Sequence, residues 1–194
     1  MGKLRTALEG HELSLTWGDF QGAVPKSLPP GEGAYTEARF NLNFGYDYDT
    51  ASKTTGYRIT EVLVQVTLDR AVMWAVKSAQ TTELLKHEQG HYDIVALVAR
   101  DLYRELTGWN SAKPPKRFRK DADLTSAANR LRRSAESLVR QLGGAGQQVG
   151  VYDTQTNHGL DTKAQEKWDK GLAAARSSGS RLVTALAGLG VGGP

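Results

Sequence analysis

The sequence predicts an α+β protein in which a small antiparallel sheet packs on long helices. Two observations carry this prediction. Over residues 35–46 and again over residues 57–68, apolar side chains recur at every second position, which is the spacing of strands with one buried face. After residue 78, apolar side chains recur at the helical spacing of 3.6 residues.

The N-terminal part of the chain contains strand and turn material. Residues 12–17 alternate between polar and apolar side chains, so we expect a short strand there. Three prolines follow within residues 18–33 and interrupt regular structure. We therefore expect a loop over residues 18–33.

A hairpin is predicted next. Residues 35–46 place alternate apolar side chains on one face, and residues 57–68 repeat the pattern. The short polar connection at residues 47–56 suits two neighbouring antiparallel strands.

Helices are predicted over much of the remaining chain. The first begins near Ser78 or Thr81 and ends before Gly108. The second extends from Asp121 to about Leu142, with acidic residues early and arginines late, as the helix dipole favours.

A third helix and a tail complete the predicted organisation. The helix covers Thr162 to about Arg176. We expect one domain over residues 1–176, followed by a Gly/Ser/Ala-rich tail over residues 177–194. The end of this tail, residues 188–194, is expected to be frayed.

Composition limits the classes of function. A chain of 194 residues can bury a substantial core. No apolar run approaches the roughly 20 residues of a membrane span, so no membrane partner is expected. The chain has no cysteine, which excludes disulfides and thiolate metal ligands. A transition-metal site must therefore use histidine and carboxylate.

The formal net charge is +4, and the basic excess gathers between residues 113 and 133. A protein that binds single-stranded nucleic acid interleaves such charge with aromatic side chains, but Phe118 is the one aromatic residue in this stretch. We expect a solvated basic surface and no nucleic-acid partner, although a basic nucleic-acid-binding protein with an accidental metal motif is an alternative.

The strongest motif is His87-Glu88-Gln89-Gly90-His91, within the first predicted helix. Two histidines four residues apart lie on the same helix face, so both imidazoles can bind one metal ion. Glu88 is rotated by about 100° from His87, where it can contact a metal-bound water. His91 shares an apolar stripe with Val95, and a buried histidine needs a partner. These features predict a Zn²⁺ site.

A catalytic zinc usually has three protein ligands and one open position. The chain has four histidines, and His158 is the preferred third ligand because it lies in a polar segment before a glycine. Asp153 and Asp93 are the alternative ligands. Asp93 is two residues after His91 and points to another helix face, so it better suits an outer hydrogen bond.

Three segments together resemble a bacterial family named domain of unknown function 922, which is predicted to consist of secreted zinc-dependent proteases of the zincin type. The segments are residues 84–94 around the motif, residues 15–22 (LTWGDFQG), and residues 152–159 followed by Gln165 and Trp168. They extend over roughly residues 13 to 170. The resemblance implies a zincin-like fold, zinc ligands at His87 and His91, and a catalytic Glu88.

The resemblance also implies export, whereas residues 1–15 carry no apolar core and predict no secretory signal peptide. The compartment stays open between these expectations.

The predicted function is hydrolysis of a protein or peptide substrate, with Glu88 taking the proton from a zinc-bound water. Tyr152 is the first candidate to stabilise the oxyanion, and Tyr92 is the second. One of the strands between residues 35 and 69 is expected to line the cleft, as edge strands do in related zincins. The alternative is a non-catalytic zinc-binding module for protein interaction.

Overall fold

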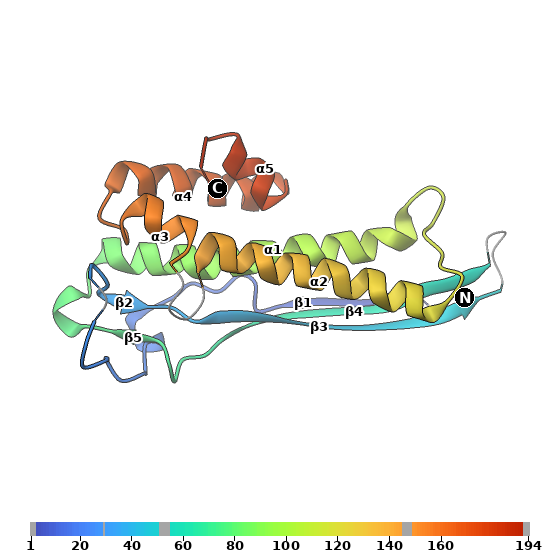
Figure 1. Cartoon of the computed structure of the whole chain (residues 1–194), viewed down its shortest axis with the longest axis horizontal. Helices are drawn as coiled ribbons and strands as arrows, with labels where there is room; N and C mark the ends of the chain where they lie inside the picture. Colours follow the sequence, from blue (N-terminus) through green and yellow to red (C-terminus); the bar gives the residue numbers. More distant parts are fainter. Residues whose placement is uncertain (1–2, 29, 51–54, 145–148, 192–194) are drawn as a thin grey trace.

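The computed structural model describes residues 3–28, 30–50, 55–144 and 149–191. These residues form a mixed α/β arrangement in three layers: a sheet, then the helices α1 and α2, then the helices α3, α4 and α5 (Figure 1). The described helices are α1 (Thr82–Ser111), α2 (Asp121–Gly143), α3 (Val151–Thr156), α4 (Thr162–Ser178) and α5 (Leu182–Ala187), with short 3₁₀ turns at Trp17–Asp19 and Lys77–Ala79.

The main sheet has the strand order β1-β4-β3. β3 and β4 pair antiparallel with Ala38 opposite Leu68, which confirms the predicted hairpin. β1 pairs with β4 in parallel, so the sheet is mixed rather than wholly antiparallel. The strands are β1 (Arg5–Glu9), β3 (Ala38–Asp49) and β4 (Gly56–Leu68), and a separate small pair is formed by β2 (Ala34–Tyr35) and β5 (Trp74–Ala75).

β4 is the central strand, and its alternate side chains form the floor of the core. Val62, Val64 and Val66 are buried on the face that α1 covers. The predicted polar connection at residues 47–56 is shorter than expected, because β3 continues to Asp49 and β4 begins at Gly56. Residues 51–54 of that connection lie outside the described residues.

The strand predicted at residues 12–17 is wrong. Residues 12–16 lie in no strand and Trp17 begins a 3₁₀ turn; the side chain of Gln89 bonds this backbone where a neighbouring strand would. The Leu15 amide donates to Gln89 Oε1 at 2.7 Å, and Gln89 Nε2 donates to the Leu13 carbonyl at 3.1 Å. One side-chain amide therefore satisfies both a backbone donor and a backbone acceptor, and no strand ladder is needed.

α1 is the central helix of the molecule, in contact with the sheet on one side and with α2, α4 and α5 elsewhere. Thr81 caps its first turn by accepting from the Leu84 amide at 3.1 Å. The helix passes the predicted end at Gly108 because Leu106 and Trp109 are buried and anchor one more turn. No helix among the described residues is long and apolar enough to cross a membrane.

The segment after α4 is held against α1, and the expected fraying is wrong for residues 188–191. Arg100 donates to the carbonyls of Ala175 and Ser180, both at 2.7 Å. Asp101 accepts from the Leu182 amide at 2.8 Å, which fixes the start of α5. Val191 is buried at the end of this segment. Residues 192–194 lie outside the described residues.

The packing of α5 leads to a testable prediction. The Leu182 side chain is 0% exposed, whereas the adjacent Val183 is 44% exposed. Leu182→Ala should lower the free energy of unfolding by about 2–5 kcal/mol, because the buried isopropyl group of the leucine is lost and a cavity remains. Val183→Ala is the matched control and should change it by less than about 0.5 kcal/mol. Urea denaturation measures both values, and equal losses would mean that α5 does not pack as described.

Candidate metal centre

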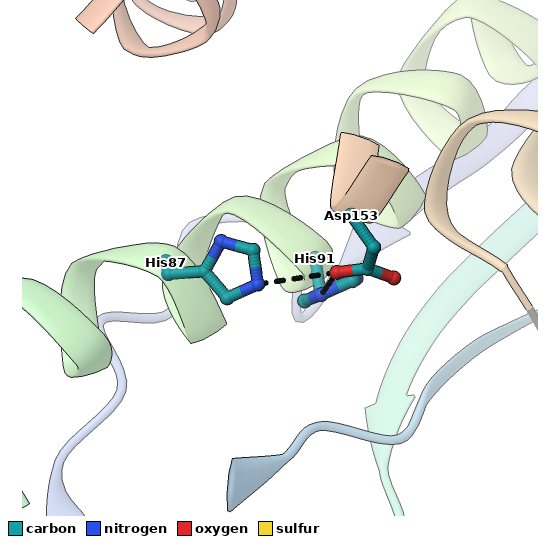
Figure 2. A group of neighbouring side chains, drawn as sticks. All are labelled: His87, His91 and Asp153. Carbon is teal, nitrogen blue, oxygen red and sulfur yellow. Dashed lines mark hydrogen bonds and ion pairs between the residues drawn. The ribbon is translucent and has the colours of Figure 1, made fainter. Parts of the chain in front are cut away.

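Three potential metal ligands converge from two helices. His87 and His91 lie one turn apart on α1, and Asp153 reaches them from α3 (Figure 2). Asp153 Oδ1 lies 3.2 Å from His87 Nε2 and 2.9 Å from His91 Nε2. The three ligand atoms lie within 4.8 Å of one another, so the group could hold a metal ion. We call these three residues the triad.

His87 is the most enclosed member of the triad, with 2% of its surface exposed. Its Nδ1 lies 3.1 Å from Oε1 of Gln165 on α4, on the side away from Asp153. Gly159, whose φ of +80° suits glycine, lies so close that a Cβ there would be 3.0 Å from the His87 ring. The turn between α3 and α4 therefore closes over this imidazole.

His91 and Asp153 stabilise each other's charged forms. Burial disfavours the imidazolium of His91 and so lowers its pKa. The Asp153 carboxylate, with Glu88 and the Gly143 backbone, outweighs this effect and raises the pKa of His91 to about 9. Burial alone would raise the pKa of the Asp153 carboxyl. The two imidazoles outweigh this effect and hold that pKa well below its usual range. The centre of the triad therefore favours a compact positive charge, which bound protons or a metal ion can supply.

Tyr152 lies directly behind the triad. Its ring stacks on His87 with centroids 4.7 Å apart and meets Trp168 edge-on at 5.0 Å. The hydroxyl donates to the His87 carbonyl at 3.1 Å and accepts from Gln165 Nε2 at 2.6 Å. Burial raises the pKa of Tyr152 well above its usual range, so the hydroxyl keeps its proton. The geometry gives Tyr152 a packing role, and it does not line the cleft described below.

Tyr92, the second candidate for the oxyanion, lies on another face of α1. Its hydroxyl donates to the Gly10 carbonyl and accepts from the Leu13 amide. Asp93, the alternative ligand on α1, is also remote from the triad, because it pairs with Arg176 at 2.5 Å and accepts from Gln89 at 2.8 Å. Both residues join α1 to its neighbours.

His158, the preferred third ligand, lies at the edge of the triad. Its Nδ1 is 3.8 Å from Asp153 Oδ1, and its ring lines the cleft. The backbone of Asn157 and His158 has positive φ of 50° and 52°. This left-handed conformation is costly for a residue such as His158, so the surrounding contacts must hold the turn in place. Asp153, the alternative named from sequence, occupies the position nearest both α1 histidines.

Glu88 is buried beside the triad with 2% of its surface exposed. Its Oε2 has no hydrogen-bond partner among the described residues. A buried carboxylate oxygen without a partner is costly, so such an atom marks a place where a ligand or water is expected.

The triad opens onto a cleft of about 350 Å³. One wall is the segment from residue 32 to residue 40, which leads through β2 into the start of β3. The opposite wall is the C-terminal part of α2. The residues of that helix in the wall are Glu136, Val139, Arg140 and Gly143.

Glu32 is a cleft residue that the sequence analysis missed. Burial raises the pKa of Glu32, and Asp153 and Glu88 act in the same direction against the opposing effect of His158. Gly31 and Gly33 flank it, and a Cβ at either would approach His158 or Leu84 within 3.4 Å. The Gly-Glu-Gly pattern was the available signal, since glycines on both sides let a chain pass close to another surface.

Comparisons of the chain with models of protein families, with curated proteins and with solved structures gave no match.

The approach of Tyr152 to α1 depends on Gly90 and can be tested. A Cβ at Gly90 would lie 2.1 Å from the Tyr152 hydroxyl oxygen, whereas one at Gly108 on the same helix would meet none of the described residues within 4 Å. Gly90→Ala should lower the free energy of unfolding by about 1–3 kcal/mol through overpacking. Gly108→Ala should raise it by up to about 1 kcal/mol, because alanine favours a helix.

Thermal or urea unfolding measures both effects. A stabilised Gly90→Ala variant would contradict the close packing of α3 on α1.

Proposed function

We propose that this chain is a zinc-dependent peptidase whose active site is the triad with Glu88. The observation that carries the proposal is the place of Glu88. Its buried Oε2 has no hydrogen-bond partner in the part of the chain that the structure describes, and the residue lines the same cleft as the three potential ligands. The resemblance of three chain segments to the predicted proteases of domain of unknown function 922 supports the same reaction.

The donor set favours zinc as the metal. Two imidazole nitrogens and one carboxylate oxygen are typical ligands of a catalytic zinc, which keeps a further position for water. Calcium and magnesium prefer oxygen ligands throughout. When bound, zinc would supply a Lewis acid and lower the pKa of a bound water toward 7.

The residues of the site would then have distinct roles. His87, His91 and Asp153 would hold the metal. Glu88 would take the proton of the attacking water at Oε2 and pass it to the leaving amine. Burial of Glu88 excludes competing water from that oxygen.

We assign to His158 the stabilisation of the oxyanion, the role that the sequence suggested for Tyr152. It lines the cleft within 3.8 Å of Asp153, whereas the Tyr152 hydroxyl is used by the His87 carbonyl and Gln165. In this proposal His158 donates a hydrogen bond to the oxyanion that forms when water attacks the carbonyl.

The substrate we propose is an extended peptide. Glu37 accepts from the Asp69 amide at 3.0 Å, so it belongs to a hydrogen-bonded pair of the hairpin. Because pairing alternates along an antiparallel ladder, Ala38 and Phe40 turn their backbone groups away from β4, to the outer edge of the sheet. Both residues line the cleft. A peptide lying along this edge could pair with β3 and bring its carbonyl to the triad.

A non-catalytic zinc-binding module is the second candidate. It would use the same three ligands, and the difference lies in turnover rather than in metal binding. The experiment on Glu88, which measures turnover, therefore separates the two functions.

The identity of the third ligand gives the first prediction. Asp153→Ala should lower zinc affinity by more than about 100-fold, beyond the usual cost of losing an outer partner of a ligand. His158→Ala should lower it by less than about tenfold. Chelator competition on the purified full chain measures both. The reverse order of losses would return the third position to His158.

The role of Glu88 gives the second prediction. Glu88→Gln keeps the shape of the side chain but removes the proton acceptor, so kcat/KM on unfolded protein or peptide substrates should fall by at least about 100-fold. Zinc content should stay at that of the unchanged protein. If the unchanged protein binds zinc but cleaves no peptide, the non-catalytic module is favoured; equal rates in the variant would rule out Glu88 as the base.

A further inference from the structure

Gln165 on α4 connects His87 to two further groups. Its Oε1 lies 3.1 Å from His87 Nδ1, while its Nε2 lies 2.6 Å from the Tyr152 hydroxyl and 2.8 Å from Asp169 Oδ1. The Gln165 side chain is buried, so protein groups must satisfy its amide.

The partners of the amide determine which way it faces. The Asp169 carboxylate lies 2.6 Å from the Lys86 ammonium and accepts hydrogen bonds. The Tyr152 hydroxyl gives its single proton to the His87 carbonyl, so its oxygen must accept as well. Both groups need a donor, and the NH₂ of Gln165 has two hydrogens to give. Its carbonyl oxygen is then left to face His87.

This arrangement also determines the tautomer of His87. A carbonyl oxygen only accepts, so His87 Nδ1 must carry a proton. In the neutral imidazole the lone pair is then on Nε2, which faces Asp153 at 3.2 Å. Metal-binding histidines need this combination of one donating nitrogen and one free nitrogen.

We propose that Gln165 is a positioning residue for the metal centre: it holds the His87 ring in place and keeps the Nε2 lone pair directed at the metal position. Asp169 and Tyr152 hold Gln165 in the required orientation. The inference rests on the metal site of the proposed function, but it concerns metal binding and does not depend on peptide cleavage.

The test compares zinc affinity in Gln165→Leu and Gln89→Leu, measured by chelator competition on the full chain. Gln165→Leu should weaken binding by about 10- to 100-fold, the usual effect of losing such an outer partner. Gln89 is the matched control, because it lies within the motif and bonds Leu13, Leu15 and Asp93 rather than the triad. Its variant should stay within about threefold of the unchanged protein.

A rescue variant separates positioning from general stability. Combining Gln165→Glu with Asp169→Asn keeps an acceptor for His87 Nδ1 and gives residue 165 a donating neighbour in place of the carboxylate. The Tyr152 hydroxyl would then turn its proton from the His87 carbonyl to the second carboxylate oxygen of residue 165. Zinc affinity should recover by about tenfold over Gln165→Leu. In ¹⁵N NMR of the zinc-loaded protein, the Nδ1–H signal of His87 should be present in the unchanged and rescued proteins and exchange-broadened in Gln165→Leu.

The outcomes are distinct. If the unchanged protein binds zinc and a folded Gln165→Leu binds it equally well, the positioning role is overturned and the peptidase proposal stands. If Gln165→Leu does not fold, the rescued protein decides, and affinity as low as about 1% of the unchanged protein would overturn the role. An unchanged protein that binds no zinc would overturn both proposals.

Discussion

The burial of His87 is the constraint on which the centre depends. An imidazole enclosed in the helical layer must satisfy two nitrogens without help from bulk water. Gln165 on α4 accepts a hydrogen bond from Nδ1, and Nε2 faces Asp153 on α3, where a bound proton or metal ion can satisfy both atoms. The stacked Tyr152 ring fills the remaining side. The contacts of this single side chain in the second layer therefore help to position α3 and α4 of the third (Figure 1).

Much of the fold could be predicted from spacing alone. The hairpin and the helices α1, α2 and α4 have strong periodic patterns, and each was predicted to within a few residues of its ends. β1 was missed because its five residues lack clear alternation and depend on pairing with distant Glu61 to Gln65. α5 was missed because glycine, serine and alanine in the flanking sequence suggested a tail, while the anchors Arg100 and Asp101 lie some eighty residues earlier.

The residues of the metal centre likewise differ in whether the sequence alone could predict their place. His87, Glu88 and His91 follow from local helix geometry, so the sequence was sufficient to group them. The choice between Asp153 and His158 depends on the turn at Asn157 and His158, whose left-handed backbone no spacing rule indicates. His158 was preferred from sequence because the chain has few histidines and this one lies in a polar segment before a glycine, but α3 directs Asp153 toward both α1 histidines. The zincin-like fold and the family resemblance stay predictions.

The irregularity in the hairpin bears on self-association. β3 is an edge strand, and an unpaired edge can recruit another copy of the same chain as readily as a substrate. The register shift at Gly45 and Tyr46 breaks the regular ladder partway along β3. Arg39, Asn41 and Asn43 add polar side chains to the remaining length. A second molecule that approached this edge would thus meet a short, interrupted ladder rather than the long, flat strand from which fibrils and sheet dimers grow.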